Sequence, residues 1–175
     1  MRVDIWSDIV CPFCYIGKRR FEEALEKFED HNNIAIEWKS FQLDPTIQPA
    51  PGKNVYEYLA ERKGISYEQS EQMHERVIAM AKDAGLEYNF DKAIIANSYD
   101  AHRLIQLAKK NKLGDAAEER LFKAYFTEGK DFGNHETLVQ IGKEIGLDEN
   151  KVRQALATNE FSNEVDADIY EAQQI

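Results

Sequence analysis

The chain has 175 residues, enough for one sizeable hydrophobic core or for a core domain with a large insertion. Its hydrophobic fraction of 43% is that of a folded protein, and a formal net charge of −10 argues against nucleic acid and anionic membranes as partners. No apolar segment is long enough to span a bilayer, and no basic stretch followed by an apolar run indicates a signal peptide. We therefore expect a cytoplasmic protein.

The chain opens with a short strand pattern over Val3–Trp6, and an amphipathic helix pattern follows from about Pro12 to Glu29. After a turn, apolar residues alternate again over residues 34–41, which predicts a second strand. Two strands joined by a helix of this length pair in parallel with a right-handed crossover. The sequence therefore predicts a β-α-β unit at its start.

The only two cysteines of the chain lie between the first strand and the helix, in the order Cys11-Pro12-Phe13-Cys14. A Cys-x-x-Cys at a strand-to-helix junction is typical of a thiol–disulfide redox centre. Cys11 falls at the helix N-cap and Pro12 at the first helical position, where a missing N–H costs nothing. We expect the helix N–H groups and dipole to lower the pKa of Cys11, which then attacks as the nucleophile. Cys14 resolves the mixed disulfide, and Pro12 and Phe13 tune the redox potential.

Two other interpretations of the motif remain open. Half of a zinc site would need two further ligands, but His31, His74, His102 and His135 show no ligand-pair spacing, so we expect no metal. Free cysteine also behaves as a small hydrophobe, so two buried, inert thiols are the second alternative.

A proline-rich segment, residues 44–52, marks a boundary, and everything after it is predicted to be helical. A capping box of Ser66 and Gln69 predicts a helix that ends near Gly85, and Asp115 with Glu118 predicts another that ends near Thr127. A further helix is predicted to begin at Asn97 or Ser98 and to end near Lys112. Three more are predicted over residues 134–146, 148–158 and 162–174.

Several stretches form recognisable patterns: Ser7-Asp8-x-x-Cys11-Pro12-Phe13-Cys14, Tyr15-Ile16-Gly17-Lys18, Phe41-Gln42-Leu43-Asp44-Pro45, Asn97-Ser98-x-x-Ala101-His102-Arg103 and Leu121-Phe122-x-Ala124-Tyr125-Phe126. Together they resemble the DsbA-like branch of the thioredoxin superfamily. Within it they are similar to FrnE-like proteins, which are grouped with 2-hydroxychromene-2-carboxylate isomerases and kappa-class glutathione transferases. The resemblance implies an α/β fold that is predominantly helical. A thioredoxin-like β-α-β unit over residues 1–44 is followed by a large all-α insertion and the start of the return to the thioredoxin-like domain over residues 45–175.

The resemblance implies a thiol–disulfide oxidoreductase that acts on protein or small-thiol disulfides through Cys11 and Cys14. Such chemistry requires no cofactor, although glutathione is a possible co-substrate. In the isomerase and transferase branch the first motif position is commonly serine, so a pair of cysteines favours the oxidoreductase. A glutathione-dependent isomerase or transferase is the alternative, and a non-catalytic interaction protein is the second alternative.

The resemblance also gives four candidates for substrate binding: Ser7, Asp8, Asn97 and His102. Asp8 either tunes Cys11 or accepts a proton, or it only satisfies the backbone of a turn. His102 lies one turn after the start of its helix and either faces the cleft of the motif or is an ordinary core or surface histidine.

Thioredoxin-like redox sites resemble one another in a cis-proline loop that faces the cysteines, and no proline of this chain follows Pro51. The chain therefore resembles a truncated form that lacks the C-terminal part of the thioredoxin domain. Two strands alone leave unpaired edges. We expect either a longer parent that supplies further strands or a homodimer in which each strand pair borrows an edge.

Overall fold

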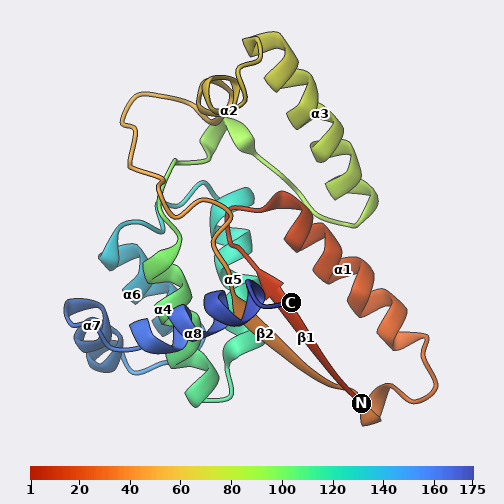
Figure 1. Cartoon of the computed structure of the whole chain (residues 1–175), viewed down its shortest axis with the longest axis vertical. Helices are drawn as coiled ribbons and strands as arrows, with labels where there is room; N and C mark the ends of the chain where they lie inside the picture. Colours follow the sequence, from red (N-terminus) through yellow and green to blue (C-terminus); the bar gives the residue numbers. More distant parts are fainter.

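The computed structural model describes all 175 residues, and its two strands form the predicted parallel pair. β1 (Arg2–Ser7) and β2 (Ala35–Ser40) run side by side with Ser7 opposite Ser40, and α1 (Pro12–Glu26) connects them (Figure 1). The predicted β-α-β unit is therefore present. α1 ends three residues before the predicted Glu29, because the N–H groups after Glu26 bond carbonyls three residues back and tighten the last turn.

The rest of the chain is helical, as the sequence predicts. Its helices are α2 (Val55–Lys63), α3 (Tyr67–Asp83), α4 (Tyr99–Lys110), α5 (Gly114–Phe126), α6 (His135–Glu144), α7 (Glu149–Ala157) and α8 (Ser162–Ala172), with short 3-10 turns at His31–Asn33 and Phe90–Lys92. None of these helices is both long and apolar enough to cross a membrane.

Side-chain caps fix the beginnings of three helices where the sequence predicts them. Ser66 and Gln69 form both hydrogen bonds of the capping box at α3. Asn134 caps α6 and Asp148 caps α7 by accepting hydrogen bonds from the backbone of the first turn. These local signals were sufficient because each bond joins residues two or three apart.

One helix was not predicted. α2 lies between the proline-rich segment and α3, where Asn54 and Glu57 form a complete capping box. Gly64 ends the helix in the left-handed conformation, with φ of 64°. Both signals stand in the sequence, so α2 was predictable from local pattern alone.

The predicted capping box of Asp115 and Glu118 is wrong. α5 begins at Gly114, two residues before the start that a cap at Asp115 would give, and no side chain caps it. The Asp115 carboxylate instead accepts a hydrogen bond from Trp38 Nε1 at 3.1 Å and pairs with Lys18 Nζ at 2.9 Å. The Asp115 carboxylate therefore bonds residues far away in the sequence and does not cap the helix.

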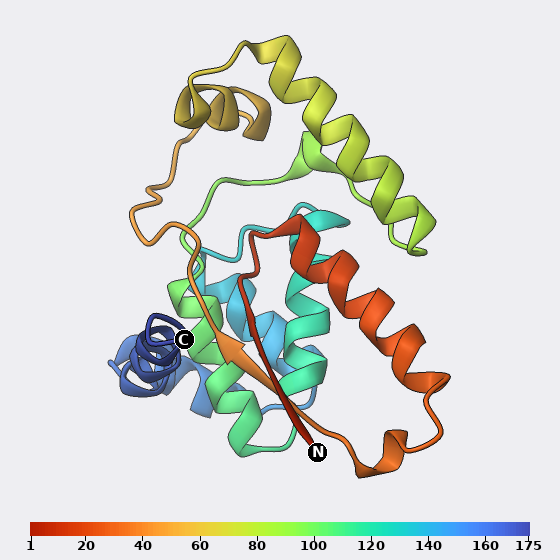
Figure 2. The ribbon, with the colours of Figure 1, turned by 45° about the vertical axis from the view of Figure 1, so that its right-hand side comes forward.

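The helices form two groups around the β-α-β unit. α2 and α3 make an upper lobe, and α4 to α8 lie beside the strands (Figures 1 and 2). Two connecting segments, residues 41–54 and 84–98, join the upper lobe to the rest, and α3 packs on α1. The start of α1 therefore lies between the lobe and the helical body.

Stacked aromatic rings attach α1 to α5. Tyr15 stacks on Phe122 with ring centroids 4.8 Å apart, and Tyr88 stacks on Phe126 at 4.5 Å. Both phenylalanines are fully buried. Because Tyr15 directly follows Cys14, this packing holds the cysteine motif against the core.

A buried carboxylate attaches α8 and α4 to β2. Asp168 accepts hydrogen bonds from the Ser40 N–H at 2.9 Å and from Gln106 Nε2 at 2.6 Å. Its backbone carbonyl accepts from Trp6 Nε1 at 2.8 Å. These bonds satisfy polar groups at the sheet and cover one side of it with helices.

Candidate active site

The structure places the cysteine motif at the first turn of α1, as predicted. Cys11 is the N-cap and Pro12 the first helical residue. The Cys11 N–H donates to the Asp8 carbonyl at 3.0 Å, and the Cys14 N–H donates to the Cys11 carbonyl at 3.1 Å. The hydroxyl of Tyr88 donates to the Pro12 carbonyl at 2.7 Å and fixes the turn from the far side. Both cysteines are half-buried free thiols.

The two sulfur atoms ionise as a pair. The hydrogen bond from Cys11 lowers the pKa of Cys14 to about 6, and the same contact raises the pKa of Cys11. This order is the reverse of our expectation, because the helix N–H groups that favour a thiolate at Cys11 are outweighed by the contact with Cys14 and by burial. The pair thus loses its first proton far below the range of a free thiol and keeps the second.

Asp8 organises the backbone beside the motif. Its side chain is 1% exposed and accepts hydrogen bonds from the N–H groups of Leu43, at 2.7 Å, and Val10, at 3.4 Å. Burial raises the pKa of Asp8, but the hydrogen bond from His102 and the further donors outweigh it, so the pKa lies below its usual value. The carboxylate joins the motif to the segment after β2.

Two predicted residues, His102 and Asn97, do not line the space beside Cys11. His102 is buried, with Nε2 3.4 Å from an Asp8 carboxylate oxygen and Nδ1 without a partner. Asn97 donates to the carbonyls of Pro45 and Ile47, at 3.0 and 3.2 Å. His102 therefore contacts the turn before Cys11, and Asn97 holds the segment after β2.

A polar cluster lies behind Cys14. Ser7 is buried, and its hydroxyl has no hydrogen-bond partner of normal geometry, yet it lowers the pKa of Cys14 and of Glu118. Glu118 is 2% exposed, and burial raises its pKa to about 8 because Ser7 and the ammonium group of Lys18 oppose the rise only in part. The Glu118 carboxyl is therefore mostly protonated at neutral pH, and it interacts electrostatically with Cys14.

Lys18 is the positive charge of this cluster. Its ammonium group is buried and pairs with Glu22, with Asp115 at 2.9 Å and with Glu119 at 3.7 Å. Burial lowers the pKa of Lys18, but the hydrogen bonds to Glu22 and Asp115 outweigh it and keep the group charged. These partners use the charge of Lys18 and leave Glu118 without a close cation of its own.

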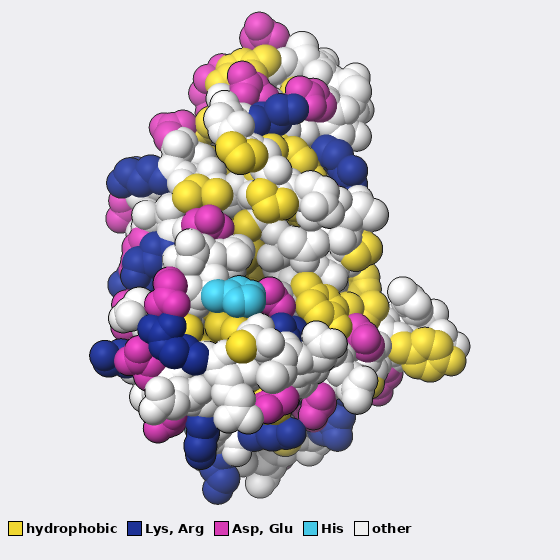
Figure 3. Space-filling view, turned by 90° about the vertical axis from the view of Figure 1, so that its left-hand side faces the viewer, with side chains coloured by type: hydrophobic (Ala, Val, Ile, Leu, Met, Phe, Trp, Pro, Cys, Tyr) yellow, Lys and Arg dark blue, Asp and Glu magenta, His cyan; other side chains and the backbone are white.

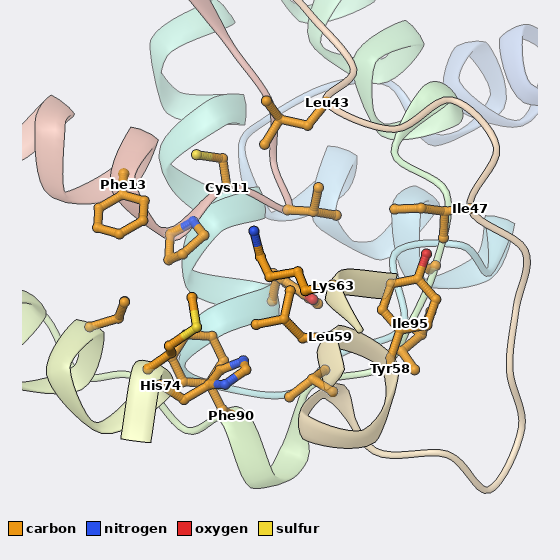
Figure 4. Close-up of a pocket in the computed structure, with 17 residues that line it drawn as sticks. Cys11, Phe13, Leu43, Ile47, Tyr58, Leu59, Lys63, His74, Phe90 and Ile95 are labelled. Carbon is orange, nitrogen blue, oxygen red and sulfur yellow. The ribbon is translucent and has the colours of Figure 1, made fainter. Parts of the chain in front are cut away.

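A cavity of about 330 Å³ opens beside Cys11. Pro12 and Phe13 line it together with Cys11, and its opposite wall comes from α2 and α3 of the upper lobe (Figure 4). Fourteen of its 17 lining residues are hydrophobic. The motif therefore has two faces, with Cys11 toward the apolar cavity and Cys14 toward the polar cluster and the core. No group of three or more His, Cys, Asp or Glu side chains is placed to hold a metal ion.

Residues 2–175 match the family of the DSBA-like thioredoxin domain. The chain belongs to this family. The match spans essentially the whole chain, so the β-α-β unit and the helices together form the family's thioredoxin fold with its helical part.

Individual relatives agree with this assignment. The probable DsbA oxidoreductase of Streptomyces coelicolor has the same fold with a TM-score of 0.93 and 35% identity, over 99% of this chain and 75% of that one. The uncharacterized protein YwbO of Bacillus subtilis is 29% identical over 164 residues, 93% of this chain and 75% of the relative. The cytosolic disulfide reductase DsbM of Pseudomonas aeruginosa shares the fold, with a TM-score of 0.68 and 15% identity, over 99% of this chain and 77% of that one.

Four residues of the site were not predicted. Glu118 does carry a signal, because it occupies an otherwise apolar helical stripe that continues through Leu121, Phe122 and Tyr125. Tyr88, Lys63 and His74 carry none, since only the packing of the upper lobe and its connecting segment brings them to the motif.

Proposed function

We propose that the chain is a thiol–disulfide oxidoreductase in which Cys11 is the nucleophile and Cys14 the resolving cysteine. The observation that supports this most is the pair of thiols at the start of α1, which share one proton while Cys11 borders an apolar cavity. A thiolate is the species that attacks a disulfide, so an easily ionised pair next to a substrate-sized space suits exchange.

The reaction proceeds in two exchanges. The Cys11 thiol first passes its proton to the Cys14 thiolate to which it donates. The Cys11 thiolate then attacks one sulfur of the substrate disulfide, forms a mixed disulfide and releases the other sulfur as a thiolate. Cys14 then attacks the Cys11 sulfur, forms the Cys11–Cys14 disulfide and releases the second substrate thiolate. The protein dithiol is oxidised by two electrons, and the substrate disulfide is reduced to two thiols. The reverse sequence oxidises a substrate dithiol.

Cys14 needs a proton acceptor in the second exchange. Once Cys11 is in the mixed disulfide, its thiol no longer donates to Cys14, and the main cause of the low pKa of Cys14 is gone. The buried Glu118 carboxyl interacts electrostatically with Cys14 and has a pKa of about 8. We assign the ionised form of this carboxyl the role of accepting the proton of Cys14, because a general base works best when its pKa is close to the working pH.

The exchange requires no cofactor. A low-molecular-weight thiol such as glutathione serves as co-substrate when two of its molecules reduce the Cys11–Cys14 disulfide and become one disulfide themselves. Two lone cysteines without a structural disulfide framework favour a reducing compartment such as the cytoplasm. A glutathione-dependent isomerase would not need Cys14, so the resolving cysteine separates the two functions.

Trapping tests the proposal. Cys14→Ser should accumulate a mixed disulfide with a labelled peptide disulfide, whereas Cys11→Ser should trap nothing. Adducts are counted by intact mass, and insulin reduction is measured in parallel with glutathione conjugation. Parental insulin reduction in both variants would show that the motif is not the redox centre, and conjugation that survives Cys14→Ser would favour the isomerase or transferase.

A further inference from the structure

The cavity beside Cys11 is lined mostly by hydrophobic side chains. Its apolar wall is built from the first turn of α1, the segment after β2, and α2 and α3, with Leu59 and Phe90 facing the interior (Figure 4). Figure 3 shows hydrophobic side chains gathered below the upper lobe on one face of the molecule. At about 330 Å³ the cavity lies at the small end of the range for small-molecule pockets.

A single charged side chain lines this cavity. Lys63, at the end of α2, extends toward the part of the cavity where Cys11 lies (Figure 4), and no Asp or Glu lines the space. Lys63 has no ion-pair or hydrogen-bond partner in the chain, whereas its neighbours on the same helix do: Arg62 pairs with Asp44 and Glu61 with Lys53. An unpaired ammonium group in a protein of net charge −10 is positioned to receive an anion from outside.

His74 does not change this charge balance. Burial lowers the pKa of His74 by more than the hydrogen bond of Nδ1 to the Ser70 carbonyl, at 2.8 Å, raises it, so the ring is neutral at physiological pH. It packs between aromatic rings, with Phe90 at 4.6 Å between centroids. The cavity therefore offers an apolar body with one cationic end next to a reactive sulfur.

We propose that this cavity binds one half of a small disulfide, a half that consists of an apolar, preferably aromatic, body and a carboxylate that pairs with Lys63. This inference rests on the proposed function and names its substrate class. The apolar body contacts Leu59 and Phe90, and the sulfur of the bound half lies at Cys11. Oxidised glutathione fits this space poorly, because its several charged groups would have one cation and otherwise apolar walls around them.

The chemistry is that of ordinary exchange. Cys11 thiolate forms a bond to the sulfur of the bound half, and the outer half leaves as a thiolate. Attack of Cys14 on Cys11 then releases the bound half as the second thiolate. The two substrate sulfurs gain two electrons and two protons in total, which the protein dithiol supplies.

Three disulfides test the proposal on the fully reduced chain. Dithiobis(nitrobenzoate) is aromatic and carries carboxylates, dithiodipyridine is aromatic and uncharged, and oxidised glutathione is polar. The second-order rate of each is followed by stopped flow in the parent protein, in Lys63→Met, and in Lys123→Met, which removes an exposed lysine of α5 that does not line the cavity.

Lys63→Met should slow dithiobis(nitrobenzoate) roughly tenfold, the usual effect of losing one charge-assisted contact, and should leave dithiodipyridine unchanged. Lys123→Met should change neither rate beyond twofold. Equal slowing of both aromatic probes would mean that Lys63 acts on the thiol, and an unchanged rate for dithiobis(nitrobenzoate) would mean that Lys63 binds no carboxylate. Either result overturns the inference.

Filling the cavity gives a second measurement that does not depend on charge. Leu59→Trp should slow both aromatic probes and spare oxidised glutathione. If the substitution changed the rates of all three probes by the same factor, the cavity would be removed from the proposal. Failure of the function itself looks different, because Cys11→Ser would then react with dithiodipyridine as fast as the parent. A parent that reacts through Cys11 but shows no effect of Lys63 or Leu59 refutes the inference and keeps the function.

Discussion

The helical body and the β-α-β unit differ in how much each relies on apolar packing and on buried polar groups. In the body, α4 to α7 bury large apolar side chains completely, and Phe122, Phe126 and Leu138 have no exposed surface. In the β-α-β unit, Ile36 on β2 is 36% exposed and Phe13 in the cysteine motif is 56% exposed. Buried polar groups such as Asp8 and Asp168 bond across elements and add to the packing of Tyr15 in fixing the unit.

This difference separates stability from chemistry. Apolar packing is non-directional, and a close-packed core responds to a missing side chain with a cavity. A buried carboxylate or hydroxyl is directional and changes with pH. We therefore expect apolar truncations to act mainly in the body and polar substitutions to act mainly around Cys11 and Cys14.

The largest effect should follow removal of a ring from the body. Phe126→Ala should lower the free energy of unfolding by about 3–5 kcal/mol, because Phe126 is fully buried and stacks with Tyr88 and Phe122. Phe13→Ala, the matched change in the exposed motif, should alter it by less than about 0.5 kcal/mol. Urea unfolding followed by circular dichroism measures both, and equal losses would erase the contrast between the two regions.

The next effect concerns Glu118, the buried carboxyl that joins the two regions. Its folded pKa of about 8 exceeds that of an unfolded glutamate, so the folded state binds the proton more tightly. The contribution of Glu118 to the free energy of unfolding is fully present at low pH. It is lost as the pH rises toward about 8, at up to about 1.4 kcal/mol per pH unit.

Glu118→Gln removes this titration. The variant should lose less stability than the parent between about pH 5 and pH 8, and its resolving step should slow at neutral pH. Urea unfolding across this pH range gives the first result, and the lifetime of the mixed disulfide gives the second. Parallel pH profiles of parent and variant would contradict the raised pKa, and an unchanged lifetime would remove Glu118 from proton exchange.

The same division explains what could be predicted from the sequence. The β-α-β order, the position of Cys11 and Pro12, and the capping box at Ser66 depend on neighbours in the chain, and the structure confirms them. α2 has equally local signals in the capping box of Asn54 and Glu57.

The failures occur where distant residues decide the outcome. Asp115 looked like a helix cap, but Lys18 and Trp38 take its carboxylate from positions far away in the sequence. The order of the two cysteine pKa values depends on how close the sulfur atoms lie, which a spacing of three residues does not determine. Lys63 lines the same cavity as Cys11 only through the packing of the upper lobe.

A smaller effect is expected at Asp8. Asp8→Asn keeps the shape of the side chain but leaves fewer acceptors for the N–H groups of Leu43 and Val10, which should lower the free energy of unfolding by about 1.5–3 kcal/mol at neutral pH. Because the pKa of Asp8 is lowered in the folded state, its contribution is present above the unfolded pKa and is lost as the pH falls through the folded one. The gap between parent and variant should narrow below about pH 4, as measured by urea unfolding, and a constant gap would show that the charge of Asp8 does not matter.

The smallest change in stability, and the sharpest in chemistry, is expected at the cysteines themselves. Limiting iodoacetamide should label Cys11 before Cys14, because Cys11 borders the cavity whereas Cys14 packs against the core.

The rate of labelling should rise with pH around a midpoint near 6, where the pair loses its first proton. Cys14→Ala removes the thiol that shares this proton and should move the midpoint upward by about one unit, equivalent to about 1.4 kcal/mol, with little change in urea unfolding. Peptide mapping by mass spectrometry reads the site of labelling. Preferential labelling of Cys14 would exchange the roles of the two cysteines, and an unshifted midpoint in Cys14→Ala would show that the helix start alone, without the second thiol, acidifies Cys11.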